Sequence, residues 1–322
     1  MEIFVTGASG FVGGAATQRL VADGHRVRAM ARSDAAEAAV RALGAEPVRC
    51  DLDNVRAEHL AGAEAVLHSA AFVEGWGPPD AWYRGNVLGT RAMLEAARSA
   101  GVARFIHIGT EAAIVHGQHL DGVDEDYPLA PDSPYPYCAT KAHAEMLVRG
   151  ANSARFTTLV LRPRFIWGPG DKTLLPAIVG MARAGKWAWI DGGRARTSTV
   201  HIANLVHAIV LALTAGRGGE AYFILDDGAR TLREVITGMA ASAGLTLPER
   251  NIPAWLADTV GWVCENTWRW FGLGGQPPLT RHATMVMSRT CVLNGDKARR
   301  ELGYTPVVGY DEGMRALRAG TG

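Results

Sequence analysis

The sequence contains little cysteine, and nothing in its arrangement suggests a metal centre or a disulfide framework. The four cysteines, Cys50, Cys138, Cys264 and Cys291, stand far apart, without a C-x-x-C pair or a histidine pair nearby. Structural zinc sites and small disulfide-bonded domains both require closely spaced cysteines. We therefore expect no metal ligands and reduced thiols, which favours a cytoplasmic protein.

The sequence also lacks an excess of either charge and any long apolar run. Its 33 basic and 32 acidic residues give a net charge of +1, which provides no footprint for nucleic acid. The apolar stretch 202–213 is interrupted by Asn204 and His207, and it falls short of the ~18 residues of a membrane span. The start lacks the apolar stretch of a signal peptide. We expect a cytoplasmic protein without nucleic-acid partner or integral membrane segment.

Short apolar runs alternate with amphipathic stretches up to about residue 161, which predicts strand-helix-strand units and a parallel sheet covered on both faces. The predicted strands are 3–6, 27–30, 47–50, 65–68, 104–108 and 158–161. The predicted helices are 14–22, 35–43, 82–99 and 137–149. With 322 residues and 48% hydrophobic composition, the chain can bury a large core.

The predicted fold class is α/β: a doubly wound parallel sheet of the Rossmann type with a smaller C-terminal α/β substrate lobe. We expect a dinucleotide-binding domain over 1–168, to which 196–225 returns, and a substrate lobe over 169–195 and 226–322. The lobe contains a tryptophan-rich helix predicted over 254–271, with Trp255, Val260, Val263 and Trp270 on one stripe. This stripe suits a packed lid, a homodimer face or a membrane-surface contact.

A glycine-rich turn directly follows the first predicted strand and opens the first predicted helix. There Gly7 permits a tight turn, Gly10 lets the backbone approach a pyrophosphate, and Gly13 lets the helix pack against the strand. The N–H groups at the helix N-terminus then face the phosphates. The cofactor-binding residues predicted in this turn are Gly7, Ser9, Gly10, Phe11, Val12 and Gly13.

The end of the second predicted strand indicates which dinucleotide is bound. An acidic residue there would bind the ribose 2′-hydroxyl of NAD, whereas an arginine would pair with the 2′-phosphate of NADP. The chain has Arg32 and Ser33 and no carboxylate, which favours NADP over NAD. Further cofactor contacts are expected after the third and fourth strands, from Asp51, Leu52, Ala70 and Ala71.

Tyr137 and Lys141 stand four residues apart, which places both on one helix face. A nearby ammonium lowers the pKa of a phenol toward the range useful for acid-base catalysis. Lys141 would also hold a cofactor ribose, with the nicotinamide beside Tyr137. Such a pair alone is typical of a solvated helix surface, but its combination with the glycine turn favours a catalytic role.

Thr110 ends the fifth predicted strand, at the sheet edge where parallel sheets present ligand-binding groups. Its hydroxyl can stabilise an oxygen that becomes an alkoxide during hydride transfer. The alternative is an ordinary strand-terminating threonine. Glu111 follows it and either contacts substrate or faces solvent.

With these motifs the chain resembles the extended short-chain dehydrogenase/reductase family, and most closely its 3β-hydroxysteroid dehydrogenase, sterol 4-carboxylate 3-dehydrogenase and 2-alkyl-3-oxoalkanoate reductase branch. Asn86 matches the family's asparagine after the fourth strand, and 161–171 matches its Arg-Pro turn beneath the nicotinamide. Many relatives have Ser-Ser where this chain has Gly109-Thr110. Sugar-nucleotide dehydratases usually have Asp-Glu directly after the threonine, whereas this chain has Glu111-Ala112 there.

The resemblance implies a bulky, apolar alcohol or ketone as the small-molecule substrate. Substrate contacts are expected from Phe72, Trp76, Glu111 and Trp167, and cofactor contacts also from Asn86 and Arg164. Arg164 and His201 could instead have structural roles. The sequence thus predicts reversible hydride transfer, with Tyr137 as acid-base group. The alternatives are a sugar-nucleotide epimerase or dehydratase with tightly bound NAD, and a non-catalytic nucleotide-binding redox sensor.

Overall fold

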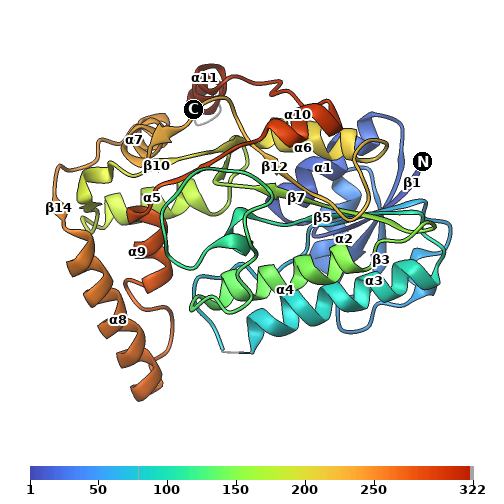
Figure 1. Cartoon of the computed structure of the whole chain (residues 1–322), viewed down its shortest axis with the longest axis horizontal. Helices are drawn as coiled ribbons and strands as arrows, with labels where there is room; N and C mark the ends of the chain where they lie inside the picture. Colours follow the sequence, from blue (N-terminus) through green and yellow to red (C-terminus); the bar gives the residue numbers. More distant parts are fainter. Residues whose placement is uncertain (79, 320–322) are drawn as a thin grey trace.

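A seven-stranded parallel sheet forms the centre of the molecule, in a computed structural model that describes residues 1–78 and 80–319 (Figure 1). In spatial order its strands are β12 (Ala221–Ile224), β7 (Thr157–Pro163), β5 (Arg104–Ile108), β4 (Ala65–His68), β1 (Glu2–Thr6), β2 (Arg26–Ala31) and β3 (Glu46–Arg49). Every neighbouring pair is parallel. The predicted doubly wound α/β fold is therefore confirmed.

Alternation along each strand divides the core into two layers. Ile3 and Val5 of β1 pack on one face of the sheet, whereas Phe4 packs on the other. Successive side chains of a strand point to opposite faces, so a strand that is apolar throughout requires helices on both faces. The first face is covered by α1 (Phe11–Ala22), α2 (Asp34–Ala42) and α6 (Ile202–Ala212), and the second by α3 (Gly89–Ser99) and α4 (Pro136–Gly150).

The predicted elements agree closely with those observed. The strands β4 and β5 and the helix α8 (Ala254–Phe271) have the predicted bounds. A difference occurs in the helix predicted over 82–99, because its first part, Tyr83–Leu88, is a π-helix that leads into α3. A π-helical turn holds one residue more than an α-helical turn and is frequent at functional sites.

A second, smaller sheet lies beside the first. It has the order β13 (Arg230–Thr231), β10 (Arg196–Thr197), β15 (Cys291–Leu293) and β6 (Leu120–Val123), with β10 and β13 antiparallel. Two short pairs complete the strands: β8 (Ile166–Trp167) with β11 (Val200–His201), and β9 (Trp189–Ile190) with β14 (Asn251–Ile252). The remaining α-helices are α5 (Leu174–Arg183), α7 (Leu232–Ser242), α9 (Arg281–Ser288), α10 (Asp296–Leu302) and α11 (Tyr310–Ala319).

The smaller sheet shows that the C-terminal part is α/β, as predicted. The residue bounds expected for the two domains stay a prediction, and 320–322 of the expected lobe lie outside the described residues. No described helix is long and apolar enough to cross a membrane. In Figure 1, α8 extends away from the main body at the lower left.

The sheet changes direction between β1 and β4, since the chain proceeds outward from β1 through β2 to β3 and from β4 through β5 to β7. At such a point the loops after the two central strands separate and leave a crevice at the carboxyl edge. The loops that follow Thr6 and His68 border this crevice. Thr6 also joins them, because its hydroxyl accepts hydrogen bonds from the backbone N–H groups of Ser69 and Ala70.

A fully buried ion pair joins α4 to β7. Arg162 donates from Nε to Glu145 at 2.9 Å, and both side chains are fully buried. Replacing Glu145 with Gln should lower the free energy of unfolding by about 3–5 kcal/mol, because it leaves a buried guanidinium without a counter-charge. Urea unfolding followed by circular dichroism measures this loss.

The matched control is Asp23→Asn, which breaks the exposed Arg19–Asp23 pair on α1 and should cost less than about 1 kcal/mol. Equal stability of Glu145→Gln and the native protein would show that the buried pair does not hold the helix on the sheet.

Candidate functional site

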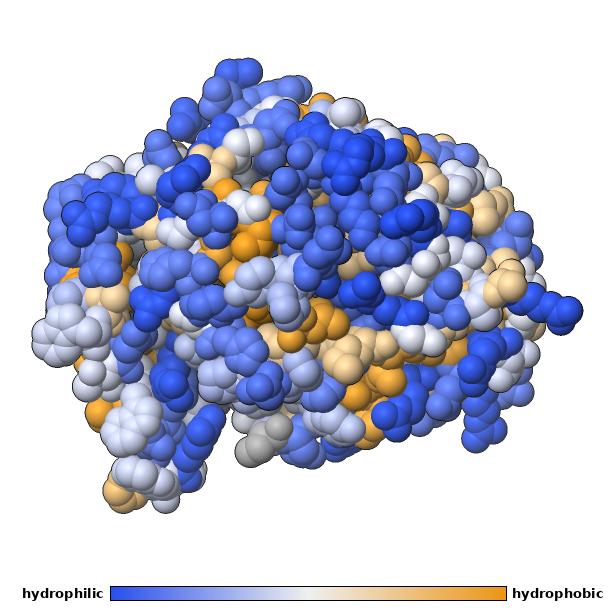
Figure 2. Space-filling view, viewed as in Figure 1, coloured by the Kyte–Doolittle hydropathy of each residue, from blue (hydrophilic) through white to orange (hydrophobic). Residues whose placement is uncertain are grey.

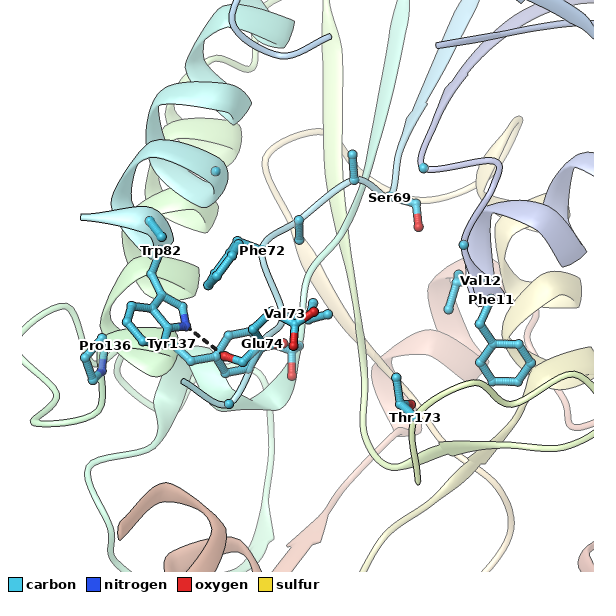
Figure 3. A pocket seen from close by; sticks show the side chains of 18 of the residues that line it. Phe11, Val12, Ser69, Phe72, Val73, Glu74, Trp82, Pro136, Tyr137 and Thr173 are labelled. Atoms are coloured by element: carbon cyan, nitrogen blue, oxygen red, sulfur yellow. Dashed lines mark hydrogen bonds between the residues drawn. The ribbon is translucent and has the colours of Figure 1, made fainter. Parts of the chain in front are cut away.

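A cleft of about 1060 Å³ runs along the carboxyl edge of the main sheet, and most of the predicted site residues lie on its wall. It extends from the glycine turn after β1 to the start of α4 and to one side of α8. Figure 3 shows Phe11, Val12 and Ser69 toward one end, with Phe72, Trp82 and Tyr137 toward the other. The cleft is thus long enough to bring a dinucleotide-type turn and the tyrosine into one continuous space.

The glycine turn closes tightly because its glycines have no side chains. Gly7 has a φ of 76°, and the N–H of Gly10 donates to its carbonyl at 2.9 Å. A Cβ on Gly13 would lie 2.2 Å from the Gly7 carbonyl oxygen, and one on Gly7 would lie 2.9 Å from the Ala70 nitrogen. Glycine at position 7 therefore lets the segments after β1 and β4 approach each other, and glycine at position 13 lets α1 approach the turn.

The N-terminus of α1 is open toward this cleft. Its N-cap residue, Gly10, provides no side-chain hydrogen bond, and its first turn contains no acidic residue. Unsatisfied N–H groups and the helix dipole then favour an anion at this point. The residues present fit the pyrophosphate of a dinucleotide. All six predicted residues of the turn line the cleft.

The residues expected around the adenosine take different positions. Arg32 lines the cleft, is exposed, and has no hydrogen bond or ion pair within residues 1–78 and 80–319. Ser33 is absent from the described wall, because its hydroxyl caps α2 by accepting the N–H of Ala36. Asp51 and Leu52 line the cleft, as do Ala70 and Ala71.

Tyr137 and Thr110 meet at the far end of the cleft, and both lie on its wall. Thr110 ends the backbone segment after β5 and donates its hydroxyl hydrogen to Glu111 Oε2 at 2.6 Å. Burial, together with the negative charge of Glu111, raises the pKa of the Tyr137 phenol, while its hydrogen bond with Thr110 acts in the opposite direction. Tyr137 is therefore protonated at neutral pH.

Lys141 lies behind this wall rather than on it. Its side chain is buried, and Nζ donates to the carbonyl oxygen of Ile108 at 3.0 Å. Burial lowers the pKa of the ammonium to about 8. Burial is the largest cause of both shifts, and Lys141 is not among the groups that shift the Tyr137 pKa.

A buried ion pair supports the polar end of the cleft. Arg164 Nη1 donates to Glu111 Oε1 at 2.5 Å, and its Nε donates to the Thr197 hydroxyl at 2.8 Å. Glu111 reaches the wall of the cleft, but the described wall does not include Arg164. Of the two roles that the sequence left open for Arg164, cofactor contact and structural support, its position fits the structural one, because its guanidinium holds Glu111 beside Thr110.

Two further predicted residues lie outside the described wall. Trp167 was expected to contact substrate, but it is fully buried; its indole N–H donates to Asp226 Oδ2 at 2.8 Å, and its ring packs against His201. Asn86 is buried in the π-helical turn, where its amide bonds both the N–H and the carbonyl of Phe72. It therefore shapes the loop that carries Phe72 and Trp76, which do line the cleft.

Several cleft residues were not predicted from the sequence. His282 lies beside Tyr137, with ring centroids 5.8 Å apart, and burial lowers the pKa of its imidazole. Lys172 reaches across the cleft and donates to the Ser9 carbonyl. Glu265 and Arg269 enter from α8. Lys172 follows the matched Arg-Pro segment and could have been suspected, whereas no sequence spacing connects His282 to Tyr137.

The chain is similar in sequence to a known family and to named reductases. The sequence profile of the NAD dependent epimerase/dehydratase family matches residues 3–224. The chain is 41% identical over 321 residues to the 4-hydroxy-2-methyl-3-oxo-4-farnesyl-3,4-dihydroquinoline-1-oxide ketoreductase of Stigmatella aurantiaca, covering 99% of this chain and 96% of that protein. It is 36% identical to a 2-alkyl-3-oxoalkanoate reductase of Stenotrophomonas maltophilia, covering 99% of each.

A solved structure has a similar fold over nearly the whole chain. The crystal structure of gox2253 superposes with a TM-score of 0.78 at 27% identity, covering 99% of this chain and 97% of that one. The predicted resemblance to the extended short-chain dehydrogenase/reductase family is confirmed. The matches extend over nearly the whole chain and so include both the glycine turn and the segment that bears Tyr137.

The close contact at Gly13 generates a test of the cofactor site. Gly13→Ala should abolish measurable NAD(P)H binding, followed by quenching of the cofactor fluorescence, because the added Cβ must displace the Gly7 backbone. Gly150→Ala, where a Cβ meets nothing within 4 Å, is the matched control and should bind normally. Normal binding by folded Gly13→Ala would place the dinucleotide elsewhere.

Proposed function

The chain belongs to the NAD-dependent epimerase/dehydratase family, and we propose that it reduces a ketone to a secondary alcohol, and catalyses the reverse oxidation, on a bulky and largely apolar substrate. The observation that carries this proposal is the protonated Tyr137 phenol beside the Thr110 hydroxyl, at the end of a cleft that begins at the glycine turn. A phenol held neutral by burial is suited to donate a proton.

When bound, the dinucleotide supplies the hydride for reduction or accepts it on oxidation. In reduction, Tyr137 donates its proton to the substrate oxygen while the carbonyl carbon gains the hydride. Thr110 stabilises the negative charge that develops on that oxygen. The hydroxyl of Thr110 now donates to Glu111, so in this proposal the substrate oxygen replaces the carboxylate as its acceptor.

In this proposal, Lys141 resupplies the proton that Tyr137 donates. Its ammonium donates to the carbonyl of Ile108, the last residue of β5, and Thr110 follows two residues later. From there the ammonium restores a proton to the Tyr137 side of the cleft. A lysine whose pKa burial lowers to about 8 exchanges protons readily near neutral pH.

The substrate end of the cleft favours a bulky, apolar compound. Phe72, Val73 and Trp76 lie on its wall, and Phe72 packs edge-on against Trp82. The related proteins named above act on a farnesylated quinoline ketone and on 2-alkyl-3-oxoalkanoates. Aromatic walls of this kind bury apolar surface and stack on planar groups.

We further propose that NADPH is preferred to NADH. The support is Arg32, an exposed guanidinium on the cleft wall at the end of β2 without a partner within the described ranges 1–78 and 80–319. Its neighbour Asp34 is drawn to Arg49, at 2.7 Å, and so leaves Arg32 free for a 2′-phosphate. An arginine in this position pairs with phosphate through charge-assisted hydrogen bonds.

Replacing Tyr137 with Phe should reduce ketone turnover by at least about 100-fold, the contribution of general acid catalysis, with NADPH affinity nearly unchanged. The assay follows NADPH consumption with a panel of 2-alkyl-3-oxo acids and 3-ketosteroids. Tyr83→Phe, an exposed tyrosine outside the described wall, is the matched control and should retain native turnover. Native turnover by Tyr137→Phe would exclude this mechanism, and product formation without net cofactor consumption would indicate an epimerase.

Replacing Arg32 with Ala should weaken NADPH binding by ~10- to 150-fold, as expected for the ~1.5–3 kcal/mol of a hydrogen bond to a charged group. NADH lacks the 2′-phosphate, so its affinity should change little. Titrating both cofactors by calorimetry measures the ratio, and Arg98→Gln, an exposed arginine on α3, is the control. An equal change for both cofactors would contradict the proposed preference.

A further inference from the structure

The outer side of α8 is apolar along its whole length. Its exposed side chains include Trp255, Trp270 and Phe271, with 69%, 72% and 74% of their surface accessible. We define the α8 apolar face as Trp255, Leu256, Val260, Trp262, Val263, Trp270, Phe271 and Leu273. Exposed aromatic and aliphatic residues gathered in this way indicate an interaction site. Figure 2 shows pale and orange residues over the tip of α8, at the lower left.

This face does not cover the cleft. The side of α8 that reaches the cleft carries Glu265 and Arg269, whereas none of the residues of the α8 apolar face is on the described wall. Of the three roles that the sequence left open for this stripe, a packed lid does not fit, because Trp255 and Trp270 are exposed to solvent. The helix thus lies between the cleft mouth and the exposed α8 apolar face.

Three uncharged polar side chains of α8 bond to their own helix. The hydroxyls of Thr259 and Thr267 donate to the carbonyls of Trp255 and Val263, and the amide of Asn266 donates to Trp262, in each case four residues earlier. Such bonds satisfy polar groups without water. The exposed tryptophans Trp255, Trp262 and Trp270 make no side-chain hydrogen bond within the described residues, so their indole N–H groups can donate to lipid headgroups.

The charged residues of α8 are turned away from the face. Asp258 accepts the Thr284 hydroxyl, and Glu265 accepts the backbone N–H of Arg281, so both acids face α9. The guanidinium of Arg269 lies 5.3 Å from the ring centroid of Trp76, on the cleft side. An uncharged surface rich in tryptophan matches the boundary between lipid headgroups and acyl chains.

We propose that the α8 apolar face binds the surface of a lipid bilayer. The exposed residues extend from Trp255, at the start of the helix, to Phe271, at its end. The helix must therefore lie along the membrane plane, with its tryptophans at headgroup level. In this orientation α8 lies between the bilayer and the mouth of the cleft, which Glu265 and Arg269 border on the opposite side of the helix. The binding itself does not depend on the reaction proposed above.

Sedimentation of the full-length protein with phosphatidylcholine vesicles tests this proposal. Wild type should sediment with the vesicles, and its tryptophan emission should shift to shorter wavelength. The variant Trp255→Ser/Trp262→Ser/Trp270→Ser/Phe271→Ser should lower the partition coefficient by at least about tenfold. A second variant, Trp270→Ser/Phe271→Ser, should give an intermediate loss. Because α8 offers little basic charge, 0.5 M salt, roughly five times the concentration that screens charges beyond ~10 Å, should not release the protein.

The matched control is Met146→Ser/Val307→Ser, two exposed apolar residues on other elements, which should bind vesicles as wild type does. Unchanged thermal unfolding of each variant shows that the fold is intact. Equal vesicle binding by wild type and the fourfold variant would overturn the proposal, as would complete release by salt. A dimer detected by light scattering that the fourfold variant loses would instead identify a second copy as the occupant, and would also overturn it.

Discussion

Two arginines at the end of β7 position the parts of the candidate site. Arg162 lies in the strand and Arg164 just beyond it, with no more than 4% of either side chain exposed. A buried guanidinium is stable only with a counter-charge, and each has an acidic partner on a different element. Arg162 pairs with Glu145 of α4, and Arg164 pairs with Glu111, directly after Thr110. The strand thus fixes the helix that bears Tyr137 and the segment that bears Thr110.

This arrangement also determines the charge at the end of the cleft. Arg164 holds the Glu111 side chain beside Thr110, and burial together with Glu111 raises the pKa of the Tyr137 phenol. Burial acts in the opposite sense on bases, lowering the pKa values of Lys141 and His282. Burial thus shifts Tyr137, Lys141 and His282 in the direction of their neutral forms. A proton donor on the wall of the cleft is the consequence, and it suits reduction of a ketone.

The two sides of α8 have separate roles in this picture. The inner side contributes charged residues to the cleft mouth and packs against α9, whereas the outer side is apolar and rich in exposed tryptophan. An amphipathic pattern on a surface helix normally directs apolar residues to the core. On α8 the apolar stripe faces solvent instead, and the proposed contact with a bilayer would cover it. An apolar substrate and a membrane-facing helix are consistent with each other.

The sequence by itself determined the features that depend on short stretches of chain. Strand alternation, the glycine turn and the four-residue spacing of Tyr137 and Lys141 follow from local geometry, so the parallel sheet and the main parts of the site could be predicted. Packing between distant segments decided the rest. Trp167 was predicted to touch substrate, yet Asp226, 59 residues away, takes its indole into the core.

His282 and the pairing of Arg164 with Glu111 depend in the same way on tertiary structure, because residues separated in sequence meet only after folding. The spacing of apolar residues predicted the stripe of α8, but it did not predict whether the stripe faces protein or solvent. Periodicity gives the apolar face of a helix, and only the placement of α8 at the edge of the molecule decides that this face meets solvent rather than protein.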